Sequence, residues 1–283
     1  MRDLLNVAIL VPEFYNSLTI ELIEINPHFI NKQKNLKSFN ISIKHHKKVE
    51  HITKTPSIII ANEFFDAMPI KQYIKSQEFW YESIFIIDPI DGKIKFDKVK
   101  LNKELQDYLL KTHLNARDGA VIEESYKSSE IIKFISQHLI AFGGSSLVID
   151  YGYSINPLAR TLHQYHSTLQ AIKNYHYHPV LETLGEADLS AHVDFYSLKT
   201  LIKNMGIVTY QLTTQQNFLI KYGILLRSQI LQSKLPPAEE DIIAKQVDRA
   251  KYIEIVTKLM INVTISMYLA LPRNSTKKGF GGI

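Results

Sequence analysis

The chain contains three short runs of apolar, largely β-branched residues, and each is followed at once by acidic or amide side chains. The runs are TIELIEI at 19–25, PSIIIA at 56–61 and SSLVIDYG, whose apolar part ends at Asp150. Runs of this kind are typical of strands buried on both faces of a parallel sheet. A lysine-rich helical segment at about 28–38 separates the first two runs. The order strand, helix, strand predicts βαβ units, and therefore an α/β fold.

Further elements are marked by apolar periodicity together with start and stop signals. We expect helices at 3–11, 128–142 and 193–205, and strands at 207–214 and 262–271. Pro12 ends the first of these helices, Gly143 and Gly144 close the second, and Asp194 opens the third. Because no internal repeat or low-complexity linker interrupts the chain, we expect residues 1–283 to form a single domain.

The sequence pattern changes at 72–101, where short aromatic and β-branched runs are separated by Asp88-Pro89 and Asp91-Gly92. Asp-Gly between such runs is a strong signal for a tight turn between antiparallel strands. We therefore predict an inserted β-hairpin at 72–101.

Composition excludes several classes of protein. With 45% hydrophobic residues the 283-residue chain can bury a sizeable core, and with no cysteine it has no disulfide, thiolate metal ligand or cysteine nucleophile. The net charge of +5 comes from scattered lysines rather than from a basic patch with aromatics, so we expect no nucleic-acid partner. No stretch approaches the roughly 20 apolar residues of a membrane span, and the first residues do not resemble a signal peptide, so we expect a cytoplasmic protein.

Candidate site residues follow the predicted strands, because ligands of open parallel sheets bind beyond the carboxyl ends of the strands. Glu24 lies at the end of the first run, Asn62 and Glu63 with Asp66 follow the second, and Asp150 with Tyr151 follows the third. A carboxylate in the position of Glu24 can accept both hydroxyls of a nucleotide ribose, although a surface or capping acid is an equal alternative.

The segment Asn62-Glu63-Phe64-Phe65-Asp66 is more informative. It places an amide, two acids and two aromatics directly after an apolar strand, where an unpaired buried carboxylate would cost several kcal/mol unless something binds it. Capping of a following helix is the structural alternative for Asp66. His176 and His178 could point the same way along an extended segment, but no third ligand is suitably spaced, so we predict no metal site.

Four blocks resemble, in order, those of the MidA family of class I S-adenosylmethionine-dependent methyltransferases. They are ANEFFDAMPIKQY at 61–73, GGSSLVIDYGY at 143–153, TLQAIKNYHYHPVL at 168–181 and GEADLSAHVDF at 185–195. PEFYNSLTIELIEINPHFINKQK, from residue 12, is also similar to the family. The resemblance implies a Rossmann-like methyltransferase sheet that uses S-adenosyl-L-methionine. Mitochondrial members of the family are arginine methyltransferases that assist complex I assembly, so it also implies a protein substrate such as a complex I subunit.

The resemblance also implies roles for individual residues. Glu24 would bind the cofactor ribose, and Asn62 and Glu63 would lie beside the transferred methyl group. Glu63 and Asp66 would orient the acceptor nitrogen and help to remove its proton, as methyl transfer to a guanidine requires. His192 and Asp194 are the next candidates on the substrate side. A loop histidine beside a helix-capping aspartate is an equally good interpretation of that pair.

The chain departs from the family at its start. Relatives carry a strand and a Gly-Pro-Gly-type turn before the DLL segment, whereas none of the 11 glycines of this chain lies before residue 92. We therefore expect an incomplete methyltransferase domain that lacks the first strand and the glycine-rich loop, with two unpaired strand edges and weak cofactor binding. A homodimer or a separate N-terminal fragment could complete it. The rival hypothesis is a non-catalytic binding or assembly factor derived from a methyltransferase.

Overall fold

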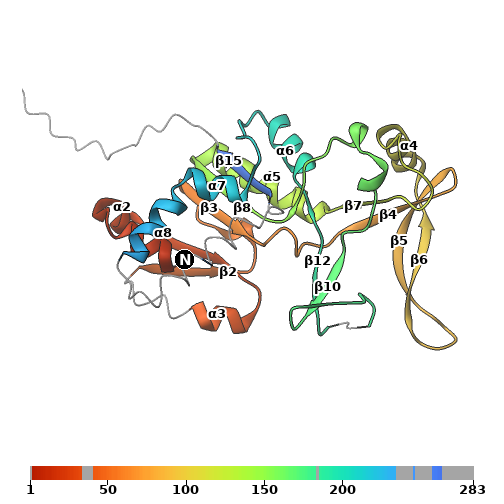
Figure 1. Cartoon of the computed structure of the whole chain (residues 1–283), viewed down its shortest axis with the longest axis horizontal. Coiled ribbons are helices and arrows are strands. Elements are labelled where there is room, and N and C mark those ends of the chain that lie inside the picture. The colour runs from red at the N-terminus through yellow and green to blue at the C-terminus, as the bar shows by residue number, and fades with distance from the viewer. Residues whose placement is uncertain (1, 34–40, 183–184, 234–244, 246–256, 263–283) are drawn as a thin grey trace, which may run out of the picture.

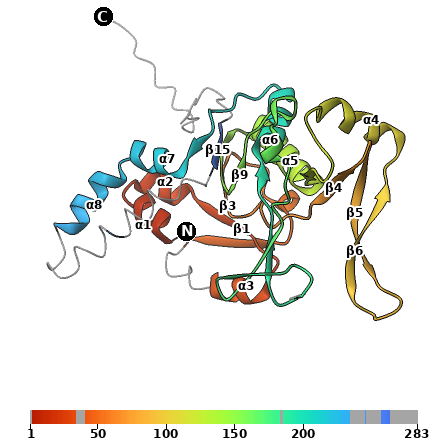
Figure 2. The same ribbon diagram turned by 45° about the vertical axis from the view of Figure 1, so that its right-hand side comes forward.

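The computed structural model describes residues 2–33, 41–182, 185–233, 245 and 257–262. Three sheets follow one another along the longest axis of the molecule in Figure 1, and the turned view in Figure 2 keeps that order. They are a two-stranded sheet at one end, a four-stranded sheet in the middle and an antiparallel sheet at the other end. A small three-stranded sheet lies between the last two in Figure 1, and a further sheet has two short strands. No described helix is long and apolar enough to span a membrane.

The first sheet pairs β1 (Thr19–Ile23) with β2 (Ser42–His46) in parallel. The predicted first helix is two helices, α1 (Arg2–Ala8) and α2 (Pro12–Ser17), because Pro12 begins a new helix as well as ending the old one. Helix α3 (Pro27–Gln33) connects the two strands. The β2 strand was not predicted, because its sequence SIKHH is mostly polar.

The central sheet has the order β14-β15-β8-β3. Strand β3 (Ser57–Asn62) runs parallel to β8 (Gly144–Ile149), and this pairing confirms the expected parallel arrangement. Strands β15 (Thr257–Asn262) and β14 (Thr213–Thr214) continue the sheet in antiparallel fashion. The strand expected at 207–214 is thus limited to its last two residues, and residues 263–271 of the last predicted strand lie outside the described residues.

Helix α5 (Tyr126–Phe142) covers the central sheet and begins two residues earlier than predicted, at a cap where the Ser125 side chain accepts a hydrogen bond from the Ser128 N–H. It ends at Gly143, as expected, with φ of 87°. Its buried face packs with α6 (Phe195–Asn204) and the sheet into the main core. The buried members of this core are Val49, Phe65, Ile131, Ile132, Ile135, Leu139, Val148, Val193, Phe195, Leu198, Ile202 and Ile207.

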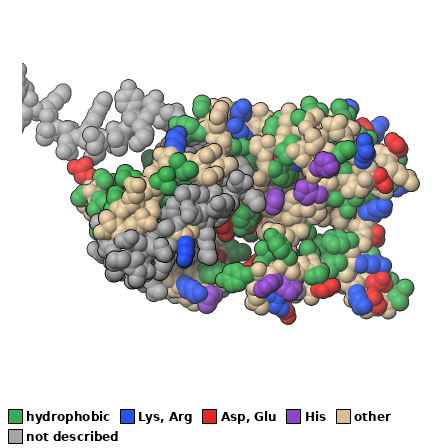
Figure 3. Space-filling model, in the orientation of Figure 1, with side chains coloured by type: hydrophobic (Ala, Val, Ile, Leu, Met, Phe, Trp, Pro, Cys, Tyr) green, Lys and Arg blue, Asp and Glu red, His purple; other side chains and the backbone are tan. Residues whose placement is uncertain are grey.

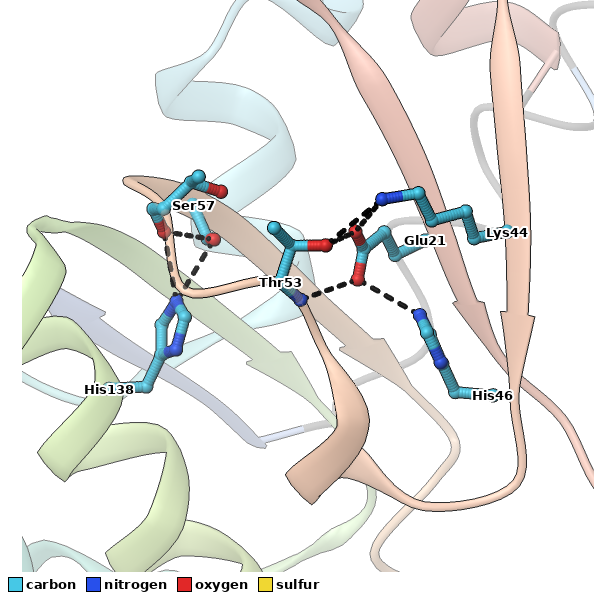
Figure 4. Close-up of polar contacts among 7 residues, drawn as sticks. Glu21, Lys44, His46, Thr53, Ser57 and His138 are labelled. Atoms are coloured by element: carbon cyan, nitrogen blue, oxygen red, sulfur yellow. Dashed lines mark hydrogen bonds and ion pairs between the residues drawn. The ribbon is translucent and has the colours of Figure 1, made fainter.

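Side chains rather than backbone pairing connect the first sheet to the central one, through the segment that leads into β3 (Figure 4). Glu21 of β1 accepts hydrogen bonds from the Thr53 N–H at 2.8 Å and from the Thr53 hydroxyl, and it contacts His46 Nε2 at 3.0 Å. His138 of α5 lies 3.0 Å from the Ser57 hydroxyl. Among the described strands β1 pairs only with β2, and β3 only with β8. Whether a further strand belongs between β1 and β3 stays a prediction.

The antiparallel sheet has the order β6-β5-β4-β7 and includes the segment predicted as a hairpin. Its strands are β4 (Lys71–Ser76), β5 (Phe79–Ile87), β6 (Ile94–Lys100) and β7 (Val121–Glu124). Helix α4 (Lys103–Thr112) packs on it over a second core that contains Tyr73, Trp80 and Leu109. Neither α4 nor β7 was predicted, and the division of the chain into one domain with an insertion stays a prediction.

The remaining elements are short. They are β9 (Gly152–Tyr153), β10 (Gln170–Lys173), β11 (His176–His178), β12 (Asp188–Ser190), β13 (Val193–Asp194), α7 (Gln215–Lys221), α8 (Ile224–Gln232) and the 3₁₀ turns Val49–His51, Pro157–Ala159 and Leu162–Gln164. Parallel pairing of β13 with β9 brings the segment after β12 to the end of the central sheet. This places the last family-like block near the residues that follow β3 and β8.

Candidate functional site: an acidic loop at the ends of β3 and β8

The ends of β3 and β8 meet because the two strands are parallel and in register. Their last pair is Asn62 with Ile149, so Glu63 and Asp150 are the first residues beyond the ladder. The Glu63 N–H still donates to the Ile149 carbonyl, at 2.9 Å. Glu63 has a φ of 46°, a left-handed conformation that non-glycine residues rarely adopt and that often marks functional sites. The chain turns sharply here, and residues 63–66 form a loop across the end of β8.

Asp150 is fully buried beneath this loop. Its Oδ2 accepts hydrogen bonds from three consecutive backbone N–H groups, those of Phe64 at 3.1 Å, Phe65 at 2.9 Å and Asp66 at 3.2 Å. Its Oδ1 accepts from the Tyr151 N–H at 3.0 Å. Burial, and then the charge of Asp66, raises the pKa of Asp150 to about 7, against the lowering effect of the loop N–H groups.

Asp66 is the second buried acid of the loop, with only 8% of the residue exposed. Its Oδ1 has no hydrogen-bond partner. Burial, and to a lesser degree the charge of Glu63, raises the pKa of Asp66. The alternative role of capping a following helix does not apply, because a turn and then β4 follow Asp66.

The Tyr151 hydroxyl interacts with the carboxylates of both Glu63 and Asp66. Burial and the charges of Asp66, Glu63 and Asp150 raise the pKa of Tyr151, so its hydroxyl stays protonated. One hydroxyl has a single proton to donate, so it cannot satisfy both carboxylates. The loop therefore presents negative charge that no described cation balances, in a chain whose net charge is +5. Figure 3 shows one face of the molecule hollowed near its middle, with acidic side chains inside the hollow.

This arrangement suits a cation with several N–H donors. An unpartnered, buried carboxylate oxygen loses hydration without compensation, and a charged donor restores the missing hydrogen bond. A guanidinium group is planar and carries five N–H donors, so it can engage Asp66 and Glu63 together. The described residues contain no cluster of three or more His, Cys, Asp or Glu side chains that could hold a metal ion.

The other predicted substrate-side residues lie beside the loop rather than within it. The Ala191 N–H donates to the Asp66 carbonyl at 3.0 Å, so the block that contains His192 contacts the loop through its backbone. Asp194 accepts hydrogen bonds from the Ser197 N–H at 3.1 Å and the Ser197 hydroxyl at 2.9 Å. Asp194 therefore caps the N-terminus of α6, as the alternative interpretation of this residue expected. Burial lowers the pKa of His192, so its ring is neutral near pH 7. A direct role for either side chain stays a prediction.

Glu24 follows β1, as predicted, and its N–H donates to the His46 carbonyl at 3.0 Å. One of its carboxylate oxygens accepts from the Asn26 N–H at 2.8 Å, which leaves the second oxygen for a ribose hydroxyl. Asn62 ends β3 with an exposed side chain. Binding of an adenosyl ligand by Glu24 and Asn62, in a cleft shared with Glu63, stays a prediction.

Glu123 was missed by the sequence analysis. This buried acid of β7 accepts hydrogen bonds from the Gln72 side chain at 2.8 Å and the Thr168 N–H at 2.9 Å. The Thr168 hydroxyl, also bonded to Glu123, accepts from the His192 N–H at 2.8 Å. Glu123 thus connects the antiparallel sheet to the backbone of His192. The only available signal was an acid inside the run AVIEES.

Comparison with known proteins decides the family. Residues 1–213 match the model of a family described as "Putative S-adenosyl-L-methionine-dependent methyltransferase". The chain belongs to this family.

Curated relatives are named protein arginine methyltransferases. The Caenorhabditis elegans protein, "Protein arginine methyltransferase NDUFAF7 homolog, mitochondrial", is 33% identical over 201 residues, which are 71% of this chain and 45% of that protein. The Danio rerio protein is 30% identical over 191 residues, 67% of this chain and 42% of that protein. The human protein is 27% identical over 202 residues, 71% and 43% of the two chains. The chain thus spans less than half the length of these relatives.

Solved structures confirm the fold. A COG1565 superfamily protein from Burkholderia thailandensis, bound to S-adenosyl-homocysteine, has a TM-score of 0.73 at 18% identity and covers 86% of this chain and 64% of its own. The native structure of a superfamily protein from the same organism has a TM-score of 0.72 at 18% identity, over 86% and 66% of the two chains. The Rossmann-like methyltransferase fold implied by the resemblance is therefore confirmed.

One prediction is wrong. The relatives are named mitochondrial proteins, which contradicts a cytoplasmic location. The prediction rested on composition and on the character of the first residues, and neither of these distinguishes one compartment from another.

Proposed function

We propose that the chain is the catalytic part of an S-adenosyl-L-methionine-dependent protein methyltransferase that acts on arginine. The single observation that carries the proposal is the acidic loop, in which Asp66 Oδ1 is buried without a partner beside Glu63. Membership of the family supports the cofactor, and the names of the relatives support the acceptor.

In this proposal Glu63 and Asp66 hold the guanidinium of the acceptor. Two carboxylates fix its plane, so that one nitrogen faces the cofactor at the strand ends while its N–H stays within hydrogen-bond reach of Asp66. They also favour positive charge on the held nitrogens, which leaves more electron density on the attacking one. Tyr151 stays neutral and has one proton to donate to this pair of carboxylates.

The cofactor, when bound, supplies an electrophilic methyl group on a sulfonium. The acceptor nitrogen must lose one proton as its bond to carbon forms, and a carboxylate of the loop accepts it. Asp66 suits this role, because burial raises its pKa and so makes it a stronger base than an exposed aspartate. Glu24 would hold the ribose, and Asn62 with Glu63 would line the site of transfer. His192 and Asp194 would contribute to the substrate side.

The finer assignments rest on the family resemblance. They are a subunit of respiratory complex I as the protein substrate, and a homodimer as the assembly. The rival, a non-catalytic assembly factor, would keep the acidic loop without performing methyl transfer.

Two binding measurements on the full chain test the proposal. Calorimetry with S-adenosyl-homocysteine tests the cofactor, and Glu24→Ala should weaken binding tenfold or more. An NMR titration with N-acetyl-L-arginine methylamide tests the acceptor, with the neutral citrulline analogue as the matched probe. Asp66→Asn should remove the preference for the arginine probe and leave S-adenosyl-homocysteine binding within about twofold.

A matched control is Asp118→Asn, since Asp118 is an exposed acid in the turn before β7 whose Oδ1 accepts from the Gln77 N–H at 2.7 Å. It should change neither affinity. Equal binding of the arginine and citrulline probes, or no binding of S-adenosyl-homocysteine, would refute the proposal. Binding of both ligands without methyl transfer to a glycine- and arginine-rich peptide would favour the assembly factor.

A further inference from the structure

The acidic loop is attached to the central sheet through Asp150. Three consecutive N–H groups that converge on one oxygen form an anion-binding nest, which elsewhere receives a phosphate or another bound anion. Here the anion is a side chain of the same protein, at 2.9–3.2 Å from the donors of residues 64–66. Since these N–H groups lie in a loop, they have no sheet or helix partner. Asp150 supplies the hydrogen bonds that secondary structure would otherwise provide.

The same contacts hold the unusual backbone of Glu63. A left-handed conformation is unfavourable for a non-glycine residue, so it persists only where neighbouring contacts impose it. Glu63 is fixed on one side by its N–H bond to Ile149 and on the other by the Phe64 N–H bond to Asp150. The direction of the Glu63 side chain, and its separation from Asp66, follow from this backbone.

Asp150 is fully buried, and its four hydrogen bonds come from backbone donors, so it does not lie where an acceptor could touch it. We propose that Asp150 is a positioning residue of the acceptor site, which acts through residues 63–66 by holding the Glu63 and Asp66 carboxylates at the spacing a guanidinium requires. The inference rests on the proposed function.

Two substitutions separate this role from general stability. Asn at position 150 keeps one oxygen that can accept the three loop N–H groups, whereas Ala keeps none. Leu109→Ala is the matched control, because Leu109 of α4 is fully buried in the separate second core. A large-to-small change there leaves a cavity, which lowers the unfolding temperature, and it keeps the loop contacts in place.

The experiment measures binding of N-acetyl-L-arginine methylamide by NMR, well below the unfolding temperature of every variant, together with amide hydrogen exchange. Asp150→Ala should weaken binding tenfold or more and speed exchange at residues 64–66 more than in β8. Asp150→Asn should keep the affinity within about threefold, and Leu109→Ala should leave it unchanged. If Asp150→Ala does not fold, Asp150→Asn provides the test. A full loss of acceptor binding in the folded Asp150→Asn protein would overturn the positioning role of Asp150.

The two possible failures are distinct. If the unaltered chain does not prefer the arginine probe over its citrulline analogue, the proposed function is wrong and the positioning role falls with it. If the unaltered chain does prefer it, two results would overturn the positioning role alone. One is an Asp150→Ala protein that binds like the unaltered chain. The other is a Leu109→Ala protein that loses affinity to the same extent as Asp150→Ala.

Discussion

Asp150 should make the stability of this protein fall as the pH rises. Its pKa is raised to about 7 in the folded chain, mainly by burial, against about 3.9 in an unfolded one. The folded state therefore binds the proton more tightly than the unfolded state. The stability associated with this proton is fully present below pH 3.9 and is lost as the pH rises through the folded pKa. A difference of about 3 pKa units at about 1.4 kcal/mol each gives a loss on the order of 4 kcal/mol.

Urea unfolding at several pH values between 4 and 8.5 measures this loss, with Asp150→Asn as the comparison. Asn resembles the protonated acid, so its stability should not include the Asp150 titration. The unaltered chain should lose stability relative to Asp150→Asn as the pH rises, with most of the change between pH 4 and 7. Since the pKa of Asp66 is also raised, both proteins should show a remaining decline in the same direction. A difference that is independent of pH, or of opposite sign, would refute the reasoning.

Two further predictions concern the sheets. Gly144→Ala should destabilise the chain by more than about 3 kcal/mol, because φ is 118° there and a Cβ would lie 2.0 Å from the Ser57 carbonyl oxygen. Gly92→Ala is the comparison: φ is 70° there and the space is open, so the change should cost only about 1 kcal/mol. Thermal unfolding of both variants measures the difference. Glu21→Gln should cost roughly 1 kcal/mol at pH 7 and less in acid. Burial raises the pKa of Glu21, but hydrogen bonds from Thr53 and His46 lower it more, so the contribution of Glu21 to stability is lost as the pH falls. Urea unfolding of both proteins at pH 7 and 3.5 tests this, and an equal cost of the substitution at the two pH values would contradict it.

The parallel strands could be predicted because burial on both faces leaves a continuous apolar run. The runs at 19–25 and 56–61 coincide with β1 and β3 to within two residues at each end. The β2 strand could not be found in this way, because its partner is β1 and its side chains are largely polar. Its position depends on tertiary contacts such as that between His46 and Glu21, which no local pattern contains.

The antiparallel sheet shows a second limit of sequence patterns. The turn at Asp91-Gly92 is a local feature of the sequence, and it sets the register in which β5 pairs with β6. Strand β7 pairs with β4, although even the nearest paired residues, Ile74 and Val121, are 47 positions apart in the sequence. Its four residues include two acids, one of which is buried because Gln72 and Thr168 donate to it. A buried acid satisfied by distant donors looks like a surface acid in the sequence.

At the candidate site, sequence position identified which acids follow the strands but not what each one does. Asp150 is the first residue after β8 and Asp66 is the fourth after β3, and Asp150 accepts four backbone hydrogen bonds while Asp66 keeps an unpartnered oxygen. The difference arises from the loop at 63–66, which folds over Asp150. Asp194 is the reverse case, since its helix-capping role was visible in the sequence as a polar residue before an apolar periodic segment.

The loop acids also predict that acceptor binding releases protons. A cation beside Asp66 favours its ionised form and offsets its repulsion of Asp150, so binding lowers the pKa of both groups. Glu63 and Tyr151 are the other titratable groups that face them, and Tyr151 stays protonated. Calorimetry of the arginine probe at pH 7, in buffers of different ionisation enthalpy, should therefore show net proton release that becomes smaller in Asp150→Asn. Heats that do not depend on the buffer would mean that the cation binds away from this pair.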